Sequence, residues 1–144
     1  MTQPHTKPKL KILAVEDNAS DVQMIQFMFD RMHQEVEILH FETGEAAMAH
    51  ISQLPENPPE GTLPHVIFLD LKLPGESGVG ILKKIKAIPA FLQIPVIINT
   101  SSTGKDDLVQ TYKYGATFFM PKHYEIDILQ DVITQLKISG RIKL

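Results

Sequence analysis

The sequence contains no cysteine. A disulfide, a thiolate zinc site and a cysteine nucleophile are therefore excluded. No stretch of the chain approaches the roughly 18 consecutive apolar residues that a membrane-spanning helix needs. Residues 1–9 are polar and contain proline, without the apolar segment of a signal peptide. We expect a cytoplasmic protein with no membrane contact.

An excess of basic residues is also missing. The 14 lysines and arginines are outnumbered by 17 aspartates and glutamates, giving a formal net charge of −3. A dedicated nucleic-acid binder would usually have a basic patch, so we expect no nucleic-acid partner. The 144 residues, 43% of them hydrophobic, are enough for one domain with a full core. We predict a flexible tail over residues 1–8 and one domain over residues 9–144, with no output domain after it.

Short apolar runs alternate with amphipathic segments along the chain. Such alternation predicts an α/β fold, a doubly wound parallel sheet of five strands with five helices on its two faces. The stretch 18–20 and Thr43 are candidate caps for the first two helices. The predicted strands are residues 10–15, 36–41, 66–69, 96–98 and 117–120. The predicted helices begin near residues 20, 44, 79, 105 and 126.

Polar side chains follow four of these strands, at the edge of the sheet where such folds bind ligands. They are Glu16, Asp17, Asp70, Thr100 and Lys122. Clustered carboxylates repel one another and need a cation or raised pKa values. Mg²⁺ prefers such oxygen ligands, and an aspartate can act as the covalent nucleophile in phosphoryl transfer. With no Ser-His-Asp pattern or nucleophile elbow in the chain, the set fits an aspartyl-phosphate site better than a hydrolytic one.

Each of these residues, taken alone, also has a purely structural interpretation. Glu16 and Asp17 could cap the first helix, where negative charge is favoured, and Thr100 could cap a later one. Asp70 could be an ordinary loop aspartate and Lys122 a solvated lysine.

Four segments, in this order, resemble the receiver domains of response regulators. They are ILAVEDN (12–18), LDLKLPGESG (69–78), PVIINTS (95–101) and GATFFMPK (115–122). Within that CheY-like family the sequence is most similar to stand-alone regulators that partner phytochrome-type histidine kinases. The resemblance implies a flavodoxin-like strand order of 2-1-3-4-5.

The resemblance also implies a role for each site residue. Asp70 accepts a phosphoryl group from a histidine kinase. Mg²⁺ is held by Asp17, by Asp70 and by the backbone carbonyl of Lys72, with Glu16 acting through a metal-bound water. The transferred oxygens are bound by Thr100 and Lys122, and Phe119 is the aromatic side chain that turns during switching.

Two positions depart from the family pattern. Lys122 is followed by His123 where the family usually has proline, preceded by a cis bond. A cis bond before a non-proline residue costs about 3 kcal/mol, so the sequence leaves that bond's isomer open. Glu16 replaces the commoner aspartate, and its longer arm still reaches a metal-bound water. The histidines have no i, i+4 metal pair, and we interpret His40 and His65 among them as isolated surface residues.

The function predicted is a phospho-accepting signalling switch that is not a metabolic enzyme. We expect it to pass the signal on by protein contact, by feedback on the kinase or by relay to another histidine. The expected partner is a histidine kinase, and a homodimer is a further expectation. Two alternatives stay open: a pseudo-receiver that only binds partners, and a small phosphohydrolase or cofactor protein on the same fold.

Overall fold

Five parallel strands form one sheet in the computed structural model, which describes residues 9–102 and 104–144. The order is β2-β1-β3-β4-β5, so the predicted fold class and strand order are confirmed. The predicted tail, residues 1–8, lies outside the described residues. The strands are β1 (Leu10–Val15), β2 (Val36–Phe41), β3 (Val66–Leu69), β4 (Val96–Thr100) and β5 (Phe118–Pro121).

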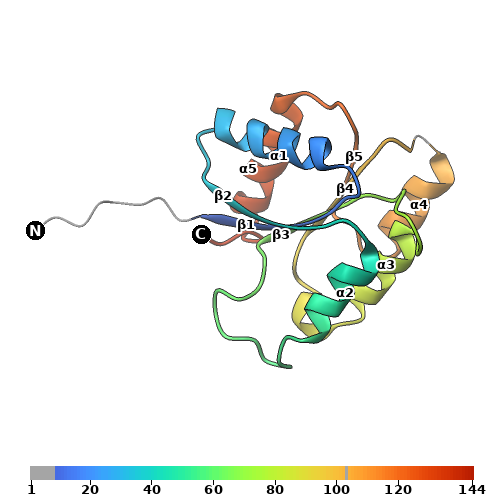
Figure 1. Cartoon of the computed structure of the whole chain (residues 1–144). Coiled ribbons are helices and arrows are strands. Elements are labelled where there is room, and N and C mark those ends of the chain that lie inside the picture. The colour runs from blue at the N-terminus through green and yellow to red at the C-terminus, as the bar shows by residue number, and fades with distance from the viewer. Residues whose placement is uncertain (1–8, 103) are drawn as a thin grey trace, which may run out of the picture.

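Helices cover both faces of the sheet. Figure 1 shows α1 and α5 on one face and α2 and α3 on the other, with α4 beside α3. Because β3 is buried on both sides, all four of its residues are apolar, as expected for a central parallel strand. The helices are α1 (Ala19–Arg31), α2 (Gly44–Ser52), α3 (Gly78–Lys86), α4 (Lys105–Lys113) and α5 (Ile126–Ile138), and a short 3₁₀ helix, η1, spans Pro89–Phe91.

Side-chain caps fix where three helices begin. Asn18 accepts a hydrogen bond from the backbone N–H of Ser20 at 2.9 Å, and Thr43 accepts one from that of Ala46 at 3.1 Å. Thr43 was predicted as this cap from the sequence, and Asn18 is the first residue of the stretch 18–20 predicted to cap α1. Ser77 caps α3 in the same way. The start of α1 matters most here, because that helix begins directly after the acidic pair Glu16–Asp17.

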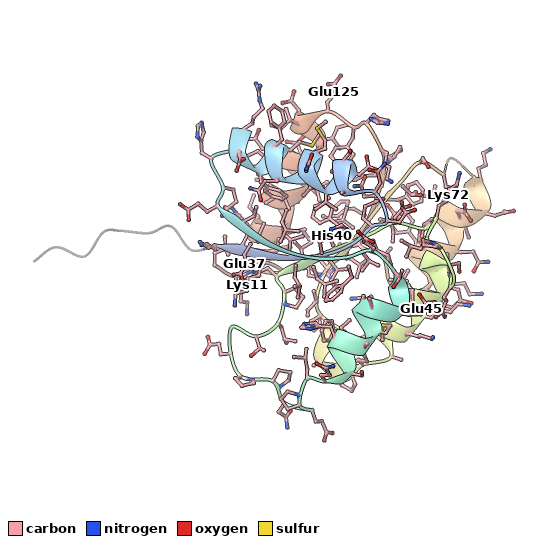
Figure 2. All side chains as sticks on the ribbon, in the orientation of Figure 1. Lys11, Glu37, His40, Glu45, Lys72 and Glu125 are labelled. Atoms are coloured by element: carbon pink, nitrogen blue, oxygen red, sulfur yellow. The ribbon has the colours of Figure 1, made fainter. Side chains whose placement is uncertain are left out.

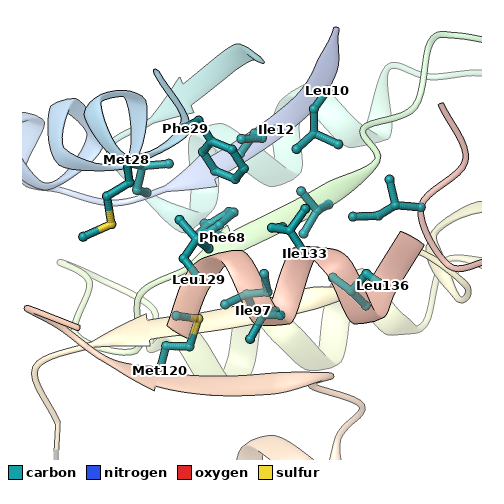
Figure 3. Close-up of a cluster of buried hydrophobic side chains, with 14 of the residues drawn as sticks. Leu10, Ile12, Met28, Phe29, Phe68, Ile97, Met120, Leu129, Ile133 and Leu136 are labelled. Carbon is teal, nitrogen blue, oxygen red and sulfur yellow. The ribbon is translucent and has the colours of Figure 1, made fainter. Parts of the chain in front are cut away.

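Two apolar layers hold the helices on the sheet. Figure 3 shows the layer under α1 and α5, where Leu129, Ile133 and Leu136 of α5 face Phe68 and Ile97 of the sheet. The second layer lies under α2 and α3. Burial of this apolar area on both faces stabilises the fold and fixes the relative positions of the strand ends.

Three details of the sequence-based prediction need correction. Two strand bounds differ, because β4 runs on to Thr100 and β5 both begins and ends one residue later than expected, its end at Pro121 being possible since an edge strand tolerates a residue without an N–H. The 3₁₀ helix at Pro89 was not predicted. His40 and His65 are not isolated surface residues, because both are half-buried and hydrogen-bonded to the backbone.

Candidate functional site

The site lies at the carboxyl edge of the sheet, where β1, β3, β4 and β5 end. Asp70 follows the central strand β3, and its backbone N–H donates to the carbonyl of Val15 in β1 at 3.0 Å. Lys122 follows β5, and its N–H donates to the carbonyl of Thr100 in β4 at 2.8 Å. The backbone ladders thus place the acidic residues and the lysine together, although 52 residues separate Asp70 from Lys122.

Three carboxylates gather at this edge. One oxygen each of Glu16, Asp17 and Asp70 lies within 4.8 Å of the others. Glu16 and Asp70 are each only 3% exposed, whereas Asp17 is exposed. Hard carboxylate oxygens at this spacing, with one of them open to solvent, fit a Mg²⁺ or Mn²⁺ ion that keeps several waters.

Asp70 is held through both of its carboxylate oxygens. The backbone N–H of Lys72 donates to Oδ1 at 3.0 Å, and the ammonium of Lys122 donates to Oδ2 at 2.9 Å. A side chain at Gly78 would overlap the carbonyl oxygen of Asp70, so the loop after β3 can fold this tightly only with glycine there. The predicted role of the Lys72 carbonyl remains a prediction.

The ammonium of Lys122 contacts three carboxylates at once. It lies 3.0 Å from Glu16, 2.8 Å from Asp21 and 2.9 Å from Asp70. Asp21 was not identified from the sequence. The only available signal was its position in the first turn of α1, four residues after Asp17, and a first-turn aspartate is ordinarily explained by the helix dipole.

Burial and crowding change the ionisation of the site. Burial is the largest cause that raises the pKa of Glu16, from 4.5 to about 7, and the charge of Asp70 adds to it, whereas hydrogen bonds from Lys122 and Asn18 act the other way. For Lys122 burial alone would lower the pKa. Its hydrogen bonds to Asp21, Asp70 and Glu16 outweigh that effect and raise the pKa above its usual value. The site therefore has an excess of negative charge that a divalent cation would relieve.

Thr100 lies at the end of β4 and is fully buried. Its hydroxyl oxygen accepts a hydrogen bond from the backbone N–H of Ser102 at 3.2 Å. The hydroxyl of Ser102 in turn donates to the carboxylate of Asp107 in α4. In this conformation the start of α4 is therefore connected to the residue expected to contact a phosphoryl group.

Phe119 is half-buried on β5. Its ring packs against the apolar layer under α2 and α3, and its backbone N–H donates to the hydroxyl of Tyr112 in α4 at 3.2 Å. This placement is compatible with the predicted turning of the ring and does not test it.

The bond between Lys122 and His123 is trans, which answers the question the sequence left open. His123 instead turns the chain with a φ of 66°, in the left-handed region that non-glycine residues seldom occupy. Lys122 still reaches the acidic residues from this backbone.

A cavity of about 420 Å³ opens beside the lysine, between α1 and the segment that leads from β5 to α5. The side-chain oxygen Oδ1 of Asn99 is buried and has no hydrogen-bond partner among the described residues. The cavity is lined by Ser20, Asp21, Met24, Ile25, Met28, Asn99, Lys122, His123 and Tyr124. Lys122 and Asp21 therefore form part of the polar lining of a space that a water molecule can enter.

This arrangement suits transfer of an anionic group to a carboxylate. The ammonium and a cation at the acidic cluster would offset the negative charge that gathers as a phosphoryl group approaches Asp70.

None of the helices in the described part of the chain has the length and apolar character of a membrane span.

Comparison with known proteins gives a consistent result. Residues 12–134 match the response regulator receiver domain family. Response regulator Rcp1 of Synechocystis sp. is 33% identical over 124 residues, which cover 85% of this chain and 82% of that protein. FilR2 of Methanothrix harundinacea, a probable methanogenesis regulatory protein, is 31% identical over 126 residues, which cover 88% of this chain and 80% of FilR2.

Solved structures of response regulators are also similar to this chain. The Mn²⁺-bound form of Rcp1 superposes with a TM-score of 0.70 at 31% identity, covering 90% of this chain and 92% of that one. The phosphorylated cyanobacterial phytochrome response regulator RcpA superposes with a TM-score of 0.72 at 28% identity over the same shares of the two chains. The chain belongs to the response regulator receiver domain family.

Proposed function

We propose that this chain is a phosphorylation-dependent signalling switch whose acceptor is Asp70. The observation that supports this most is the setting of that carboxylate. It is buried at the end of the central strand, beside the Lys122 ammonium and inside a cluster of metal-binding type. A loop aspartate with only a capping role would need neither the ammonium nor the two further carboxylates.

In the proposed reaction an oxygen of Asp70 attacks the phosphorus of a phosphohistidine on a histidine kinase. A P–O bond forms while the P–N bond breaks, and the histidine nitrogen keeps the electron pair. Mg²⁺ would supply charge neutralisation on the transferred oxygens. Asp17, Asp70 and the Lys72 carbonyl would hold the ion, with Glu16 acting through a bound water. Lys122 would pair with the phosphoryl oxygens on the other side.

The proposed output is a change of conformation that the phosphoryl group stabilises. Thr100 would donate its hydroxyl to the new oxygens, and the Phe119 ring would turn inward behind it. Because the Ser102–Asp107 hydrogen bond connects Thr100 to α4, movement at Thr100 would reach the surface formed by α4 and β5.

The partner we propose is a histidine kinase of the phytochrome type, because Rcp1 and RcpA are similar over most of this chain. A homodimer through α4 and neighbouring elements is a second proposal, supported by Leu108, Val109 and Tyr112, which are exposed on α4. Sedimentation at several concentrations tests it. We further propose that the protein works in the cytoplasm, without contact to a membrane or a nucleic acid, and that residues 9–144 act as one receiver unit.

The function is tested with acetyl phosphate as the phosphoryl donor. We expect the protein to gain one phosphoryl group per chain in Mg²⁺ and essentially none in excess EDTA, as measured by intact mass. No gain in Mg²⁺, with folded protein, would instead favour the pseudo-receiver. Continuous release of inorganic phosphate from unrelated phosphate esters would favour the phosphohydrolase.

The lifetime of the phosphoryl group gives a separate prediction. Lys72 and Ser102 lie two residues after Asp70 and Thr100, and we expect them to border the path of attacking water. Lys72 is exposed and has only donors, and the Ser102 hydroxyl is already bonded to Asp107. Neither is placed to orient a water molecule, and the long stem of Lys72 can cover the phosphoryl group.

Lys72→Asn should therefore accelerate loss of the phosphoryl group by several-fold, on the order of 1 kcal/mol in the barrier. Lys72 lies at the end of the sheet opposite Lys11 and Glu37 (Figure 2). Decay is followed in excess Mg²⁺ after the donor has been removed. Lys105→Asn, a change of the same kind at an exposed lysine of α4, is the control. Decay as slow as in the unchanged protein would contradict the shielding role.

A further inference from the structure

The Lys122 ammonium has three N–H groups, and three different carboxylates surround it. The distances are 3.0 Å to Glu16, 2.8 Å to Asp21 and 2.9 Å to Asp70. An ammonium has only three donors, so each carboxylate uses one of them. Glu16 and Asp70 belong to the cluster that would face a cation, and Asp21 does not.

The position of Asp21 is fixed by the start of α1. The cap residue Asn18 accepts hydrogen bonds from the backbone N–H groups of both Ser20 and Asp21, at 2.9 Å and 3.1 Å. A favourable helix dipole would explain an aspartate in this first turn. It does not explain why the carboxylate is directed at a lysine 101 residues further along the chain, with only 23% of the side chain exposed.

Lys122 needs such an anchor because its ammonium lies at the end of a long, flexible side chain. The residue that follows is His123, after a trans bond, and the lysine side chain has several free torsions. A divalent cation at the acidic cluster would attract Asp70 directly and Glu16 through a bound water, and this would weaken their hold on the ammonium. Asp21 is then the contact that keeps the ammonium beside Asp70.

Holding the lysine in this way leaves donors for the reaction. Asp21 occupies one N–H, and the two that Glu16 and Asp70 release can bind oxygens of the incoming phosphoryl group. An ammonium that is already in place avoids the entropy cost of ordering a flexible lysine during the reaction. The opposing effect is that the charge of Asp21 repels an anionic donor, but its carboxylate is paired with Lys122 and partly open to solvent.

We propose that Asp21 is a positioning residue for phosphoryl transfer, which acts by holding the Lys122 ammonium beside Asp70. This inference rests on the proposed function and adds to it a residue outside the metal cluster.

The test measures the rate of phosphorylation by acetyl phosphate in saturating Mg²⁺. Asp21→Ala removes the anchor and should slow the reaction on the order of 10-fold, the equivalent of about 1.4 kcal/mol. Asp21→Asn keeps an acceptor oxygen without the charge, and its rate should lie between those of Asp21→Ala and the unchanged protein. Asp21→Glu keeps the charge and should recover part of the rate. The Mg²⁺ concentration for half-maximal rate should stay within about 2-fold, because Asp21 is not a metal ligand here.

The matched control is Asp30→Asn, at the other end of the same helix. Asp30 is exposed, and its carboxylate accepts a hydrogen bond from Gln26 on its own helix at 2.9 Å. This change removes the same charge from α1 and should leave the rate unaltered. Thermal unfolding of every variant separates slow transfer from loss of fold.

A double-mutant cycle with Lys122→Met decides whether Asp21 acts through the lysine. In that background Asp21→Ala should cause no further slowing, because the group it positions is gone. Losses that multiply, or an Asp21→Ala single variant that reacts at the unchanged or a faster rate, would overturn the inference. If the unchanged protein takes up no phosphoryl group, the proposed function fails and this inference with it. Uptake that is insensitive to Asp21 overturns this inference alone.

Discussion

Asp70→Asn is expected to abolish uptake of a phosphoryl group from acetyl phosphate, which intact mass will show. The carboxylate oxygen is the nucleophile in the proposed reaction, and an amide at the same place is a far weaker one. The loss should therefore persist at any Mg²⁺ concentration. Labelling of this variant to the level of the unchanged protein would refute the assignment of the acceptor.

The same substitution should stabilise the protein when no metal is present. Glu16, Asp21 and Asp70 surround one ammonium, and the charge of Asp70 contributes to the raised pKa of Glu16. Removing one buried negative charge relieves repulsion, at the cost of a weaker hydrogen bond to Lys122. We expect the repulsion to win, with a gain of about 1 kcal/mol in the free energy of unfolding in EDTA, measured with urea.

Asp17→Asn is the matched control, because Asp17 belongs to the same cluster but is exposed. Both variants should lose most of the stabilisation that Mg²⁺ gives the unchanged protein, since the ion binds the native site selectively. Only Asp17→Asn should still be phosphorylated, slowly, in high Mg²⁺. If the melting temperature of the unchanged protein did not depend on the Mg²⁺ concentration, the metal site as a whole would be contradicted.

The second large effect is a dependence of stability on pH that Mg²⁺ reverses. The pKa of Glu16 is about 7 in the folded protein and 4.5 as its ordinary value, mainly because the side chain is buried. Between these values the folded state binds a proton that the unfolded state has lost. The contribution of Glu16 to stability therefore falls as the pH rises through this window, by about 2 kcal/mol in the absence of metal.

Another group opposes this trend. Burial lowers the pKa of His65 below 6.5, so its contribution to stability grows as the pH rises toward that value. The contribution of Lys122 is unaffected, because its raised pKa lies far above the window and the residue stays charged throughout. The difference between the unchanged protein and Glu16→Gln isolates Glu16, since both contain His65 and Lys122.

That difference is measured by urea unfolding in EDTA between about pH 5 and about pH 8. We expect the unchanged protein to lose about 2 kcal/mol relative to Glu16→Gln over this range. In excess Mg²⁺ the loss should vanish or change sign, because the ion favours the deprotonated carboxylates. Glu42→Gln, at an exposed glutamate after β2, should follow the unchanged protein. A constant difference across the range would contradict the raised pKa.

The residue pattern was sufficient for the strands and helices and for the position of the candidate site. β1 and β3 are short apolar runs that end at Glu16 and Asp70, and a run of that length between turn residues can be buried as a parallel strand. Once strands and helices alternate, right-handed crossovers leave few topologies, and the polar residues that follow the strands must meet at one edge. The order of the strands came from the family resemblance, and the structure agrees with it.

The sequence did not predict which side chains pair with each other within the site. No local pattern indicates that Asp21 contacts Lys122 across 101 residues of chain, because the contact depends on how α1 and β5 pack on the same sheet. The sequence also gave no sign of where the Ser102 hydroxyl points. It could have faced Asp70, but in the structure it donates to Asp107.

The sequence by itself thus determined which residues stand at the ends of the strands, since that follows from apolar periodicity and chain connectivity alone. Only the tertiary structure decided the pKa values of these residues and the contacts that fix their side chains. The three carboxylates on one ammonium and the raised pKa of Glu16 both arise from burial and from distances between segments remote in sequence. Such through-space energies depend on a few ångströms of packing, which no linear pattern encodes.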